Sequence, residues 1–399
     1  MTPSRIPAAA LALLAALLTA PPAWADFNDA PPKAAGQAPA FPGQTRAPVL
    51  PQPLRLNQET LVEGLRGPWG MALLPDGGLL ITEKPGAMRL YRDGKLSPPI
   101  KGLPKVDARG QGGLLDVAVA PDFARTRAVW FTFSQPDGQK SATSVGTGRL
   151  SADGSTLEQV QVIFSSRPSV NSTRHFGSRL VFGRDGTVFV TTGDRGNPPQ
   201  SPVSQDLGGH LGKVLRLDPA TGQPAQGNPF ASGQGQPAIW SLGHRNIQAA
   251  ALDPQGRLWI VEHGANGGDE LNRPQTGRNY GWPVISYGQN YDGTPIGAGL
   301  TTRQGMEQPV YYWDPVIAPS GMMFYDGAMF PEWRGDALIG GLRAGAVVRL
   351  KLQGDRVIGE QRLAEGIGRV RDIAVAPDGA LLVLIDGKGG SLLRLSRPR

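Results

Sequence analysis

The sequence predicts an all-β protein, a six-bladed β-propeller with long inter-strand loops. One strand–turn–strand phrase recurs along the chain, and it pairs β-rich runs with a turn of the Asp-Gly type, in which glycine accepts positive φ. The 55 glycines and 37 prolines also leave few windows in which a helical apolar period could continue. A repeated hairpin without helices is typical of propeller blades.

The six copies of the phrase justify the six blades in chain order. They occupy residues 70–82, 115–123, 180–192, 249–261, 320–327 and 372–384, of which the fifth is the loosest match. Their spacing is wider than a minimal four-stranded blade requires, so several loops must be long. A β-sandwich is the alternative fold, but it would not repeat one hairpin phrase six times. In a propeller, loops from different blades converge at one end of the channel, where ligands usually bind.

Two segments precede the propeller. Residues 1–25 carry a positive start at Arg5, an apolar run and the small-x-small signal of residues 23–25, which predicts a secretory signal peptide cut after Ala25. The mature protein is therefore expected in the periplasm or outside the cell. Residues 26–54 are rich in proline and alanine and indicate a flexible or extended lead-in, so the propeller should span residues 55–399.

Composition narrows the classes of partner. The chain has no cysteine, so disulfides and thiolate metal sites are excluded, and core burial or bound ions must stabilise the exported fold. No second apolar run approaches the length of a membrane span. The formal charge is +7, but the arginines are dispersed and lysine runs are missing. This pattern favours a small anionic ligand over nucleic acid.

All four histidines lie within one 89-residue stretch, each within two residues of a glycine: His175, His210, His244 and His263. His175 comes just before the third phrase and Asp194 just after it, so the hairpin should return the carboxylate to the imidazole. A carboxylate that fixes the imidazole tautomer produces a general base. The alternative is a structural polar pair that closes a blade, and spacing alone does not decide between them.

Two further patterns suggest binding groups. The run from Glu262 to Glu270 has acidic ends and central glycines, which suits the oxygen ligands of Ca²⁺, although it has no EF-hand register and could be a flexible acidic loop. Zinc fits less well, because the histidines lack local ligand spacing. In the Arg369-x-Arg371 run both side chains face one way, so they need an anion between them or partners such as Asp336 or Asp372.

Several motifs in order resemble one family. The chain is similar to the soluble, calcium-dependent pyrroloquinoline quinone (PQQ) sugar dehydrogenases, especially the bacterial aldose sugar dehydrogenase branch, over about residues 55 to 397. The motifs are Gly110-Gln-Gly-Gly-Leu-Leu115, His175-Phe-Gly-Ser-Arg-Leu180, Gln205-Asp-Leu207 with His210-Leu-Gly-Lys213, Gly243-His-Arg-Asn246, Asn279-Tyr-Gly-Trp-Pro283, Gly341-Leu-Arg343 and Arg369-Val-Arg-Asp372.

The resemblance implies a role for each matching position. His175 would be the general base, Asp194 its orienting carboxylate, and Arg245 the cation that polarises the quinone carbonyl. It implies that PQQ contacts Gln111, His175, Arg245, Asn246, Arg343, Arg369 and Arg371, with Tyr291 as a less certain contact. It also implies that the carbonyls of Gly264 and Ala265 bind the Ca²⁺ that PQQ chelates, and that Glu270 and Tyr280 bind a second, structural calcium.

The implied activity is oxidation of aldose sugars at the anomeric carbon to the lactone, with hydride transfer to PQQ and then to an electron acceptor. Two departures affect specificity. Arg174 replaces an acidic residue of the glucose-oxidising branch, and Arg343 replaces a lysine. Both departures put glucose specificity in doubt. The chain also lacks the long insertions of the glucose-oxidising branch, which favours a broad aldose preference and a monomer. The alternatives are a metal-dependent lactonase-type hydrolase and a non-catalytic binding propeller.

Overall fold

The computed structural model describes residues 27–51, 55–196, 202–387 and 389–398. The chain divides into two units, residues 1–30 and 31–399, and the second unit contains every strand and helix of the described residues. The predicted signal peptide and its cleavage site lie outside the described residues. Among the helices described, none has the length and apolar character needed to span a membrane.

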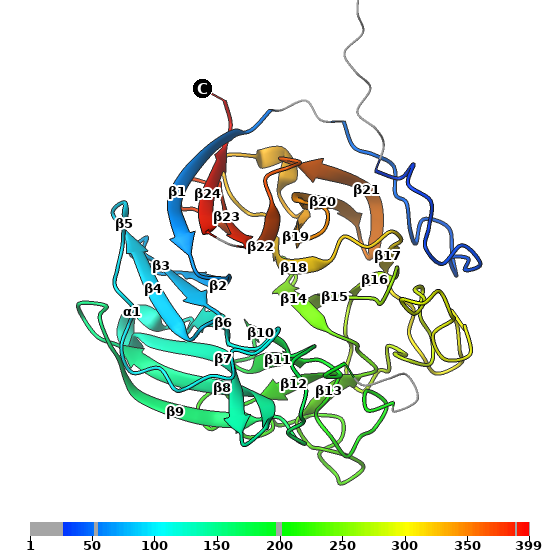
Figure 1. Ribbon diagram of the computed structural model, residues 1–399, viewed down its shortest axis with the longest axis horizontal. Coiled ribbons are helices and arrows are strands. Elements are labelled where there is room, and N and C mark those ends of the chain that lie inside the picture. The colour runs from blue at the N-terminus through cyan, green and yellow to red at the C-terminus, as the bar shows by residue number, and fades with distance from the viewer. Residues whose placement is uncertain (1–26, 52–54, 197–201, 388, 399) are drawn as a thin grey trace, which may run out of the picture. The chain divides into compact units, whose positions relative to one another are not determined.

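Six four-stranded antiparallel sheets follow one another around a common axis, and we number them as blades 1 to 6 from their inner strands (Figure 1). Blade 1 contains β2 (Pro68–Leu73), β3 (Leu79–Glu83), β4 (Ala87–Arg92) and β5 (Lys95–Leu96). Blade 2 contains β6 (Leu114–Val119), β7 (Ala128–Asp137), β8 (Lys140–Leu150) and β9 (Leu157–Ser165). Blade 3 contains β10 (Gly177–Phe182), β11 (Val188–Thr192), β12 (Lys213–Leu217) and β13 (Ile239–Leu242).

The second half repeats this arrangement. Blade 4 contains β14 (Ile247–Leu252), β15 (Leu258–Glu262), β16 (Asp269–Asn272) and β17 (Tyr311–Trp313). Blade 5 contains β18 (Pro319–Phe324), β19 (Ala337–Gly341), β20 (Ala346–Gln353) and β21 (Arg356–Leu363). Blade 6 contains β22 (Arg369–Val375), β23 (Leu381–Asp386), β24 (Gly390–Ser396) and β1 (Asn57–Leu65). Two short helices, α1 (Phe123–Thr126) and η1 (Pro331–Trp333), lie in loops.

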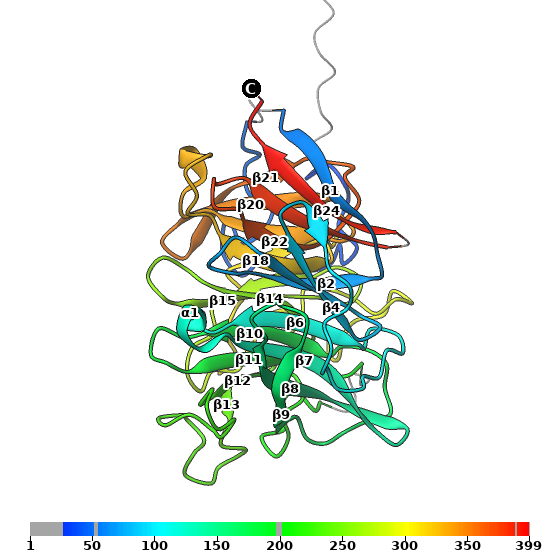
Figure 2. The same cartoon turned by 90° about the vertical axis from the view of Figure 1, so that its left-hand side faces the viewer.

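Strand β1 closes the ring. It pairs antiparallel with β24, from Asn57 opposite Ser396 to Leu65 opposite Gly390, and both views show the two strands side by side (Figures 1 and 2). The last blade therefore combines strands from both ends of the propeller, and this pairing closes the ring of blades. This architecture confirms the predicted six-bladed β-propeller, and the six sequence phrases fall on the inner strands and the turns that follow them.

Each inner strand carries an irregularity near its start. In β6 the register with β7 shifts between Leu114 and Val117, and in β10 the register with β11 shifts between Gly177 and Leu180. A β-bulge redirects the extra residue of a strand, and such bulges concentrate near functional sites. Here the bulges contain Asp116 on β6 and Arg179 on β10, which meet at the axis.

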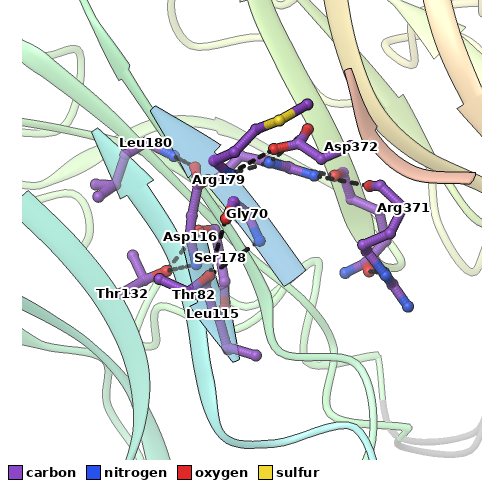
Figure 3. A network of polar contacts seen from close by, with 12 residues as sticks. Gly70, Thr82, Leu115, Asp116, Thr132, Ser178, Arg179, Leu180, Arg371 and Asp372 are labelled. Carbon is purple, nitrogen blue, oxygen red and sulfur yellow. Dashed lines mark hydrogen bonds and ion pairs between the residues drawn. The ribbon is translucent and has the colours of Figure 1, made fainter. Parts of the chain in front are cut away.

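The Arg179 guanidinium joins three blades at the axis (Figure 3). Its Nη1 lies 3.0 Å from Asp116 of blade 2 and 3.2 Å from Asp372 of blade 6. Asp372 also accepts a hydrogen bond of 2.9 Å from the backbone N–H of Met71 in blade 1. All three charged side chains are buried, and burial raises the pKa of Asp116 to about 6. Because buried charges require partners, this cluster ties the blades together.

Residues 31–51 lie along blades 4 and 5. Val49 forms a parallel bridge with Glu360 of β21, and Ala47 is 1% exposed within the core cluster of these blades. Composition alone had indicated a flexible or extended lead-in here. The described part of this segment consists of turns, bends and one isolated bridge, and specific contacts hold it in place.

Candidate active site

Two neighbouring cavities share the side chain of Gln111. The first is lined by inner-strand residues and by the arginines of β22, including Asn246, Gln248, Arg369 and Arg371. The second lies beside it and is lined by His175, Asp194, Arg245 and Tyr291, among others. The structure therefore gathers most of the predicted site residues around one continuous region.

His175 and Asp194 form a close pair on the wall of the second cavity. His175 precedes β10 and Asp194 follows β11, and the hairpin brings Nδ1 of the imidazole to 2.6 Å from Oδ1 of the carboxylate. The other carboxylate oxygen accepts a hydrogen bond of 2.8 Å from the indole N–H of Trp282. His175 has a φ of 47°, and its backbone N–H donates to Oε1 of Gln111 at 2.7 Å. Contacts of the ring and of the backbone of His175 therefore both fix the position of the imidazole.

This geometry suits a neutral imidazole. An Nδ1–H that donates to Asp194 leaves Nε2 as the acceptor of the ring. Burial lowers the pKa of His175 below its usual value; the hydrogen bond to Asp194 opposes this shift, and the charges of Arg245 and Arg174 add to it. A neutral, oriented imidazole can accept a proton near neutral pH.

Arg245 and Asn246 lie just before β14. The backbone N–H of Arg245 donates to Glu262 at 2.6 Å, and its Nη1 donates to the carbonyl of His263 at 3.2 Å. Its Nε is buried and has no partner among the described residues. Oδ1 of Asn246 accepts from the backbone N–H of Gly177 at 3.2 Å. These hydrogen bonds hold the guanidinium of Arg245 at the second cavity, and its buried Nε–H is left without a partner among the described residues.

Two of the three predicted C-terminal arginines reach the first cavity. Arg369 and Arg371 both line it, and both approach Oδ2 of Asp386 on β23, at 3.7 Å and 3.4 Å. The sequence had suggested Asp336 or Asp372 as their partners, which is wrong: Asp336 pairs with Arg349, and Asp372 pairs with Arg179. Nε of Arg371 is buried without a described partner.

Arg343 behaves differently from these two arginines. It is exposed in the turn after β19, and neither cavity is lined by it, although its neighbour Leu342 lines the first. Its backbone N–H donates to the carbonyl of Ile317 at 3.0 Å. Within the described residues, the structure does not bring Arg343 together with the other predicted cofactor contacts.

The other three histidines make structural contacts. Nδ1 of His244 lies 2.8 Å from Glu262, and its ring stacks on Tyr280 at 5.0 Å. Nε2 of His263 lies 2.6 Å from the carbonyl of Pro319, and Nδ1 of His210 accepts from the backbone N–H of Arg167 at 3.1 Å. His263 also lines the first cavity, whereas His210 and His244 line neither cavity.

The predicted calcium ligands are only partly assembled. Ala265 lines the second cavity, whereas the carbonyl of Gly264 accepts a hydrogen bond from Arg245. Oε2 of Glu270 accepts from Asn272, and the Tyr280 hydroxyl donates to the carbonyl of Arg273. Burial and the nearby Glu262 charge raise the pKa of Glu270 well above its ordinary value. In the part of the chain that the structure describes, no three acidic or histidine side chains gather into a metal-binding group.

Sequence reasoning did not assign roles to several residues that line the site: Trp69, Lys84, Gln248, Trp282 and Asp386. Trp282 stood inside a motif that had been recognised, and Gln248 follows Asn246 at the two-residue spacing of a strand face. Asp386 ends β23 opposite Arg369 at the start of β22, so the hairpin argument that placed Asp194 beside His175 could also have identified Asp386.

The fold and the site together define a six-bladed propeller whose cavities combine an oriented imidazole with several cationic and amide donors. A family model described as Glucose / Sorbosone dehydrogenase matches residues 65–394. An aldose sugar dehydrogenase of Escherichia coli (strain K12) is 43% identical over 351 residues, which cover 86% of this chain and 94% of the relative. The chain belongs to the Glucose / Sorbosone dehydrogenase family, and it is an oxidoreductase.

Solved structures agree with this assignment. The soluble aldose sugar dehydrogenase from Escherichia coli, in its apo-form, is 42% identical with a TM-score of 0.82, and the match covers 86% of this chain and 100% of that chain. The PQQ-bound aldose sugar dehydrogenase from Streptomyces coelicolor is 29% identical with a TM-score of 0.72, covering 86% and 99%. These comparisons favour the dehydrogenase over the lactonase and the non-catalytic propeller.

Proposed function

We propose that this protein oxidises aldose sugars at the anomeric carbon to the lactone, with PQQ as the hydride acceptor and His175 as the general base. The observation that carries the proposal is the His175–Asp194 pair, with its 2.6 Å contact, on the wall of a cavity that also presents Arg245. The PQQ-bound relative supports the choice of cofactor. Export to the periplasm or medium, a monomeric state and a separate electron acceptor complete the proposal.

The side chains present fit PQQ, which carries three carboxylates and an orthoquinone. Two buried guanidinium N–H groups, Nε of Arg245 and Nε of Arg371, have no partner among the described residues. Arg369, Gln111 and Asn246 supply further donors around the same cavities. We propose that these five side chains hold the cofactor, with Tyr291 at the mouth, and Arg343 as a contact only if its exposed side chain turns inward. When bound, PQQ supplies the acceptor for the hydride.

We also propose calcium as a second cofactor, at the carbonyls of Gly264 and Ala265, with a structural ion near Glu270 and Tyr280. The like charges of Glu262 and Glu270 favour a nearby cation or a proton. However, the Gly264 carbonyl already accepts from Arg245, and no described interaction joins Glu270 to Tyr280. We therefore derive no catalytic step from the metal.

The residues of this chain divide the work between proton transfer and charge stabilisation. Asp194 accepts from Nδ1 of His175, so Nε2 can take the proton of the anomeric hydroxyl as C1 is oxidised to the lactone carbonyl. Trp282 and the backbone N–H of Gly196 hold the carboxylate in place, at 2.8 Å and 2.7 Å. The guanidinium of Arg245 lines the same cavity and can stabilise negative charge that develops on the cofactor oxygen.

The test is reconstitution of the apo-protein with PQQ and Ca²⁺. With an aldose and an artificial electron acceptor, we expect dye reduction that depends on PQQ, and a PQQ-induced rise in Tm. His175→Ala should lower kcat by about 10²–10⁴-fold, the range for loss of a general base, and should still bind PQQ. Arg369→Ala should chiefly weaken PQQ binding.

Two outcomes would overturn the proposal. If no common aldose reduces the dye and PQQ does not raise the Tm, the protein is not a PQQ sugar dehydrogenase. If His175→Ala keeps wild-type turnover, the assigned base is wrong.

A further inference from the structure

The segment formed by residues 31–51 lies outside the family match at 65–394, yet it is anchored at several points. Both carboxylate oxygens of Asp314 accept backbone N–H groups of this segment, from Lys33 at 2.8 Å and from Ala34 at 2.9 Å. Gln44 is 0% exposed and donates from Nε2 to the carbonyl of Pro309 at 2.9 Å. At the far end, Nε2 of Gln361 donates to the carbonyl of Pro51 at 2.8 Å.

A further contact of this segment lies next to residues that line the second cavity. Nε2 of Gln37 donates to the carbonyl of Gly288 at 3.1 Å. Gly288 belongs to the long connection between β16 and β17, and the next residue, Gln289, exchanges backbone hydrogen bonds of 3.0 Å and 3.2 Å with Asn266. Asn290 and Tyr291, which follow directly, line the cavity, as does Ala265.

Tyr287, on the other side of Gly288, is held by the same segment. Its hydroxyl lies 3.1 Å from Oε1 of Gln44 and 2.5 Å from Oε1 of Gln308, and its ring stacks on Tyr312 with centroids 4.0 Å apart. Residues 31–51 therefore contact the connection at Gly288 through Gln37 and at Tyr287 through Gln44, while Asn266 holds Gln289 on the other side. Beyond these anchors, Asn290 donates from Nδ2 to Thr294 and to the carbonyl of Pro295 within its own loop, both at 3.0 Å, whereas Tyr291 is 79% exposed.

We propose that residues 31–51 position the wall of the cavity formed by residues 287–291, and that Gln37 is the positioning residue for the sugar. This inference rests on the proposed function, because it assigns the sugar to the cavity that holds His175. Gln37 does not touch the reacting atoms. It acts through the Gly288 carbonyl, which sets the place of Asn290 and Tyr291 at the mouth.

The test compares two full-length variants that each remove one side-chain amide. Gln37→Ala loses the bond to Gly288. Gln361→Ala loses the bond to Pro51 at the other end of the segment, together with the bond of 2.8 Å that its Oε1 accepts from Nη1 of Arg349. We expect Gln37→Ala to raise the KM for aldoses about fivefold, the value of one hydrogen bond, with kcat and PQQ affinity unchanged. Gln361→Ala should leave the KM unchanged.

A third variant and a second measurement keep the inference falsifiable. Gln37→Glu keeps the size of the side chain but cannot donate to the carbonyl, so it should behave as Gln37→Ala. Amide hydrogen exchange of residues 283–300 should accelerate in both Gln37 variants and not in Gln361→Ala. Equal KM and equal exchange in all variants would overturn the inference. If no aldose is oxidised but exchange still accelerates, only the proposed function has failed.

Discussion

At the scale of single residues, the proton affinity of His175 depends on three neighbouring charges. Burial and the charges of Arg245 and Arg174 lower its pKa, while Asp194 opposes them. Because protonated imidazole cannot accept the sugar proton, kcat/KM should fall as pH drops through a value below the usual 6.5.

The exposed Arg174 offers a way to test this acid limb. Arg174→Gln removes one cation and should move the limb to higher pH, whereas Arg174→Lys should leave it in place. The measurement is kcat/KM against pH at constant ionic strength. Superimposable profiles for wild type and Arg174→Gln would show that Arg174 does not act on His175.

The second prediction for a single residue concerns the free energy of unfolding and the titration of His210. Burial, followed by the charges of Lys213 and Arg167, lowers its pKa from 6.5 to about 4. The unfolded chain therefore binds more protons than the folded chain between those values, so the free energy of unfolding should decrease as pH falls through this window. The loss from this one group is roughly 3 kcal/mol at most.

A matched variant isolates the contribution of His210. In His210→Asn, the amide oxygen can accept the backbone N–H of Arg167, as Nδ1 does at 3.1 Å, but the side chain no longer titrates. Urea unfolding at pH 7 and pH 4.5 should show a smaller decrease for the variant. An unchanged decrease would assign the acid sensitivity to other groups.

At the scale of elements, a buried threonine on the second strand of blade 1 and of blade 2 joins each of these blades to the next (Figure 3). In blade 2, Oγ1 of Thr132 accepts the backbone N–H of Asp116 at 2.9 Å and donates to the carbonyl of Ser178 in blade 3 at 2.8 Å. Thr82 of blade 1 similarly accepts from Gly70 at 2.9 Å and donates to Leu115 in blade 2. The hydroxyl thus satisfies backbone groups that the bulges leave unpaired.

Removing the hydroxyl of Thr132 should therefore lower the free energy of unfolding by more than the size of the group suggests. Thr132→Val keeps the shape but leaves two buried backbone groups without partners, which should lower the free energy of unfolding by roughly 2–3 kcal/mol. Thr132→Ser keeps the hydroxyl and loses a methyl group, so its cost should be about 1 kcal/mol. Chemical denaturation measures both. If the serine variant is as unstable as the valine variant, packing rather than hydrogen bonding dominates.

Local signals explain what the sequence could predict. A hairpin is formed by residues that are close in the sequence, so the six blades could be predicted from the repeated phrase. The third hairpin also placed Asp194 beside His175. Contacts between distant segments have no such signal. The pairing of β1 with β24 and the bridge between Val49 and Glu360 are contacts of this kind. Asp386 differs from them, because it lies opposite Arg369 within the hairpin of β22 and β23, next to Arg371. Arg343 was predicted as a cofactor contact from a motif match, but its side chain lines neither cavity.

At the scale of the whole propeller, the ring must hold its blades around an axis that also supports the site. Arg179 connects Asp116 and Asp372, and its Nη2 donates to the carbonyl of Arg371 at 3.4 Å. Its guanidinium also lies 4.5 Å from the ring centroid of Trp69. The side chain of Arg371 lines the first cavity. The axial cluster therefore links the closure of the ring to the placement of a proposed cofactor contact.

Removing the cation alone should be severe. Arg179→Met leaves two buried carboxylates facing each other without a cationic partner, although each still accepts a backbone N–H, and breaking a buried pair in this way costs about 3–5 kcal/mol. Adding Asp116→Asn and Asp372→Asn removes the uncompensated charges, so the triple variant should regain part of this loss. Thermal and urea unfolding of the single and triple variants measure the difference. A triple variant no more stable than Arg179→Met would mean that the packing of Arg179 against Trp69, and not charge compensation at the axis, holds the blades together.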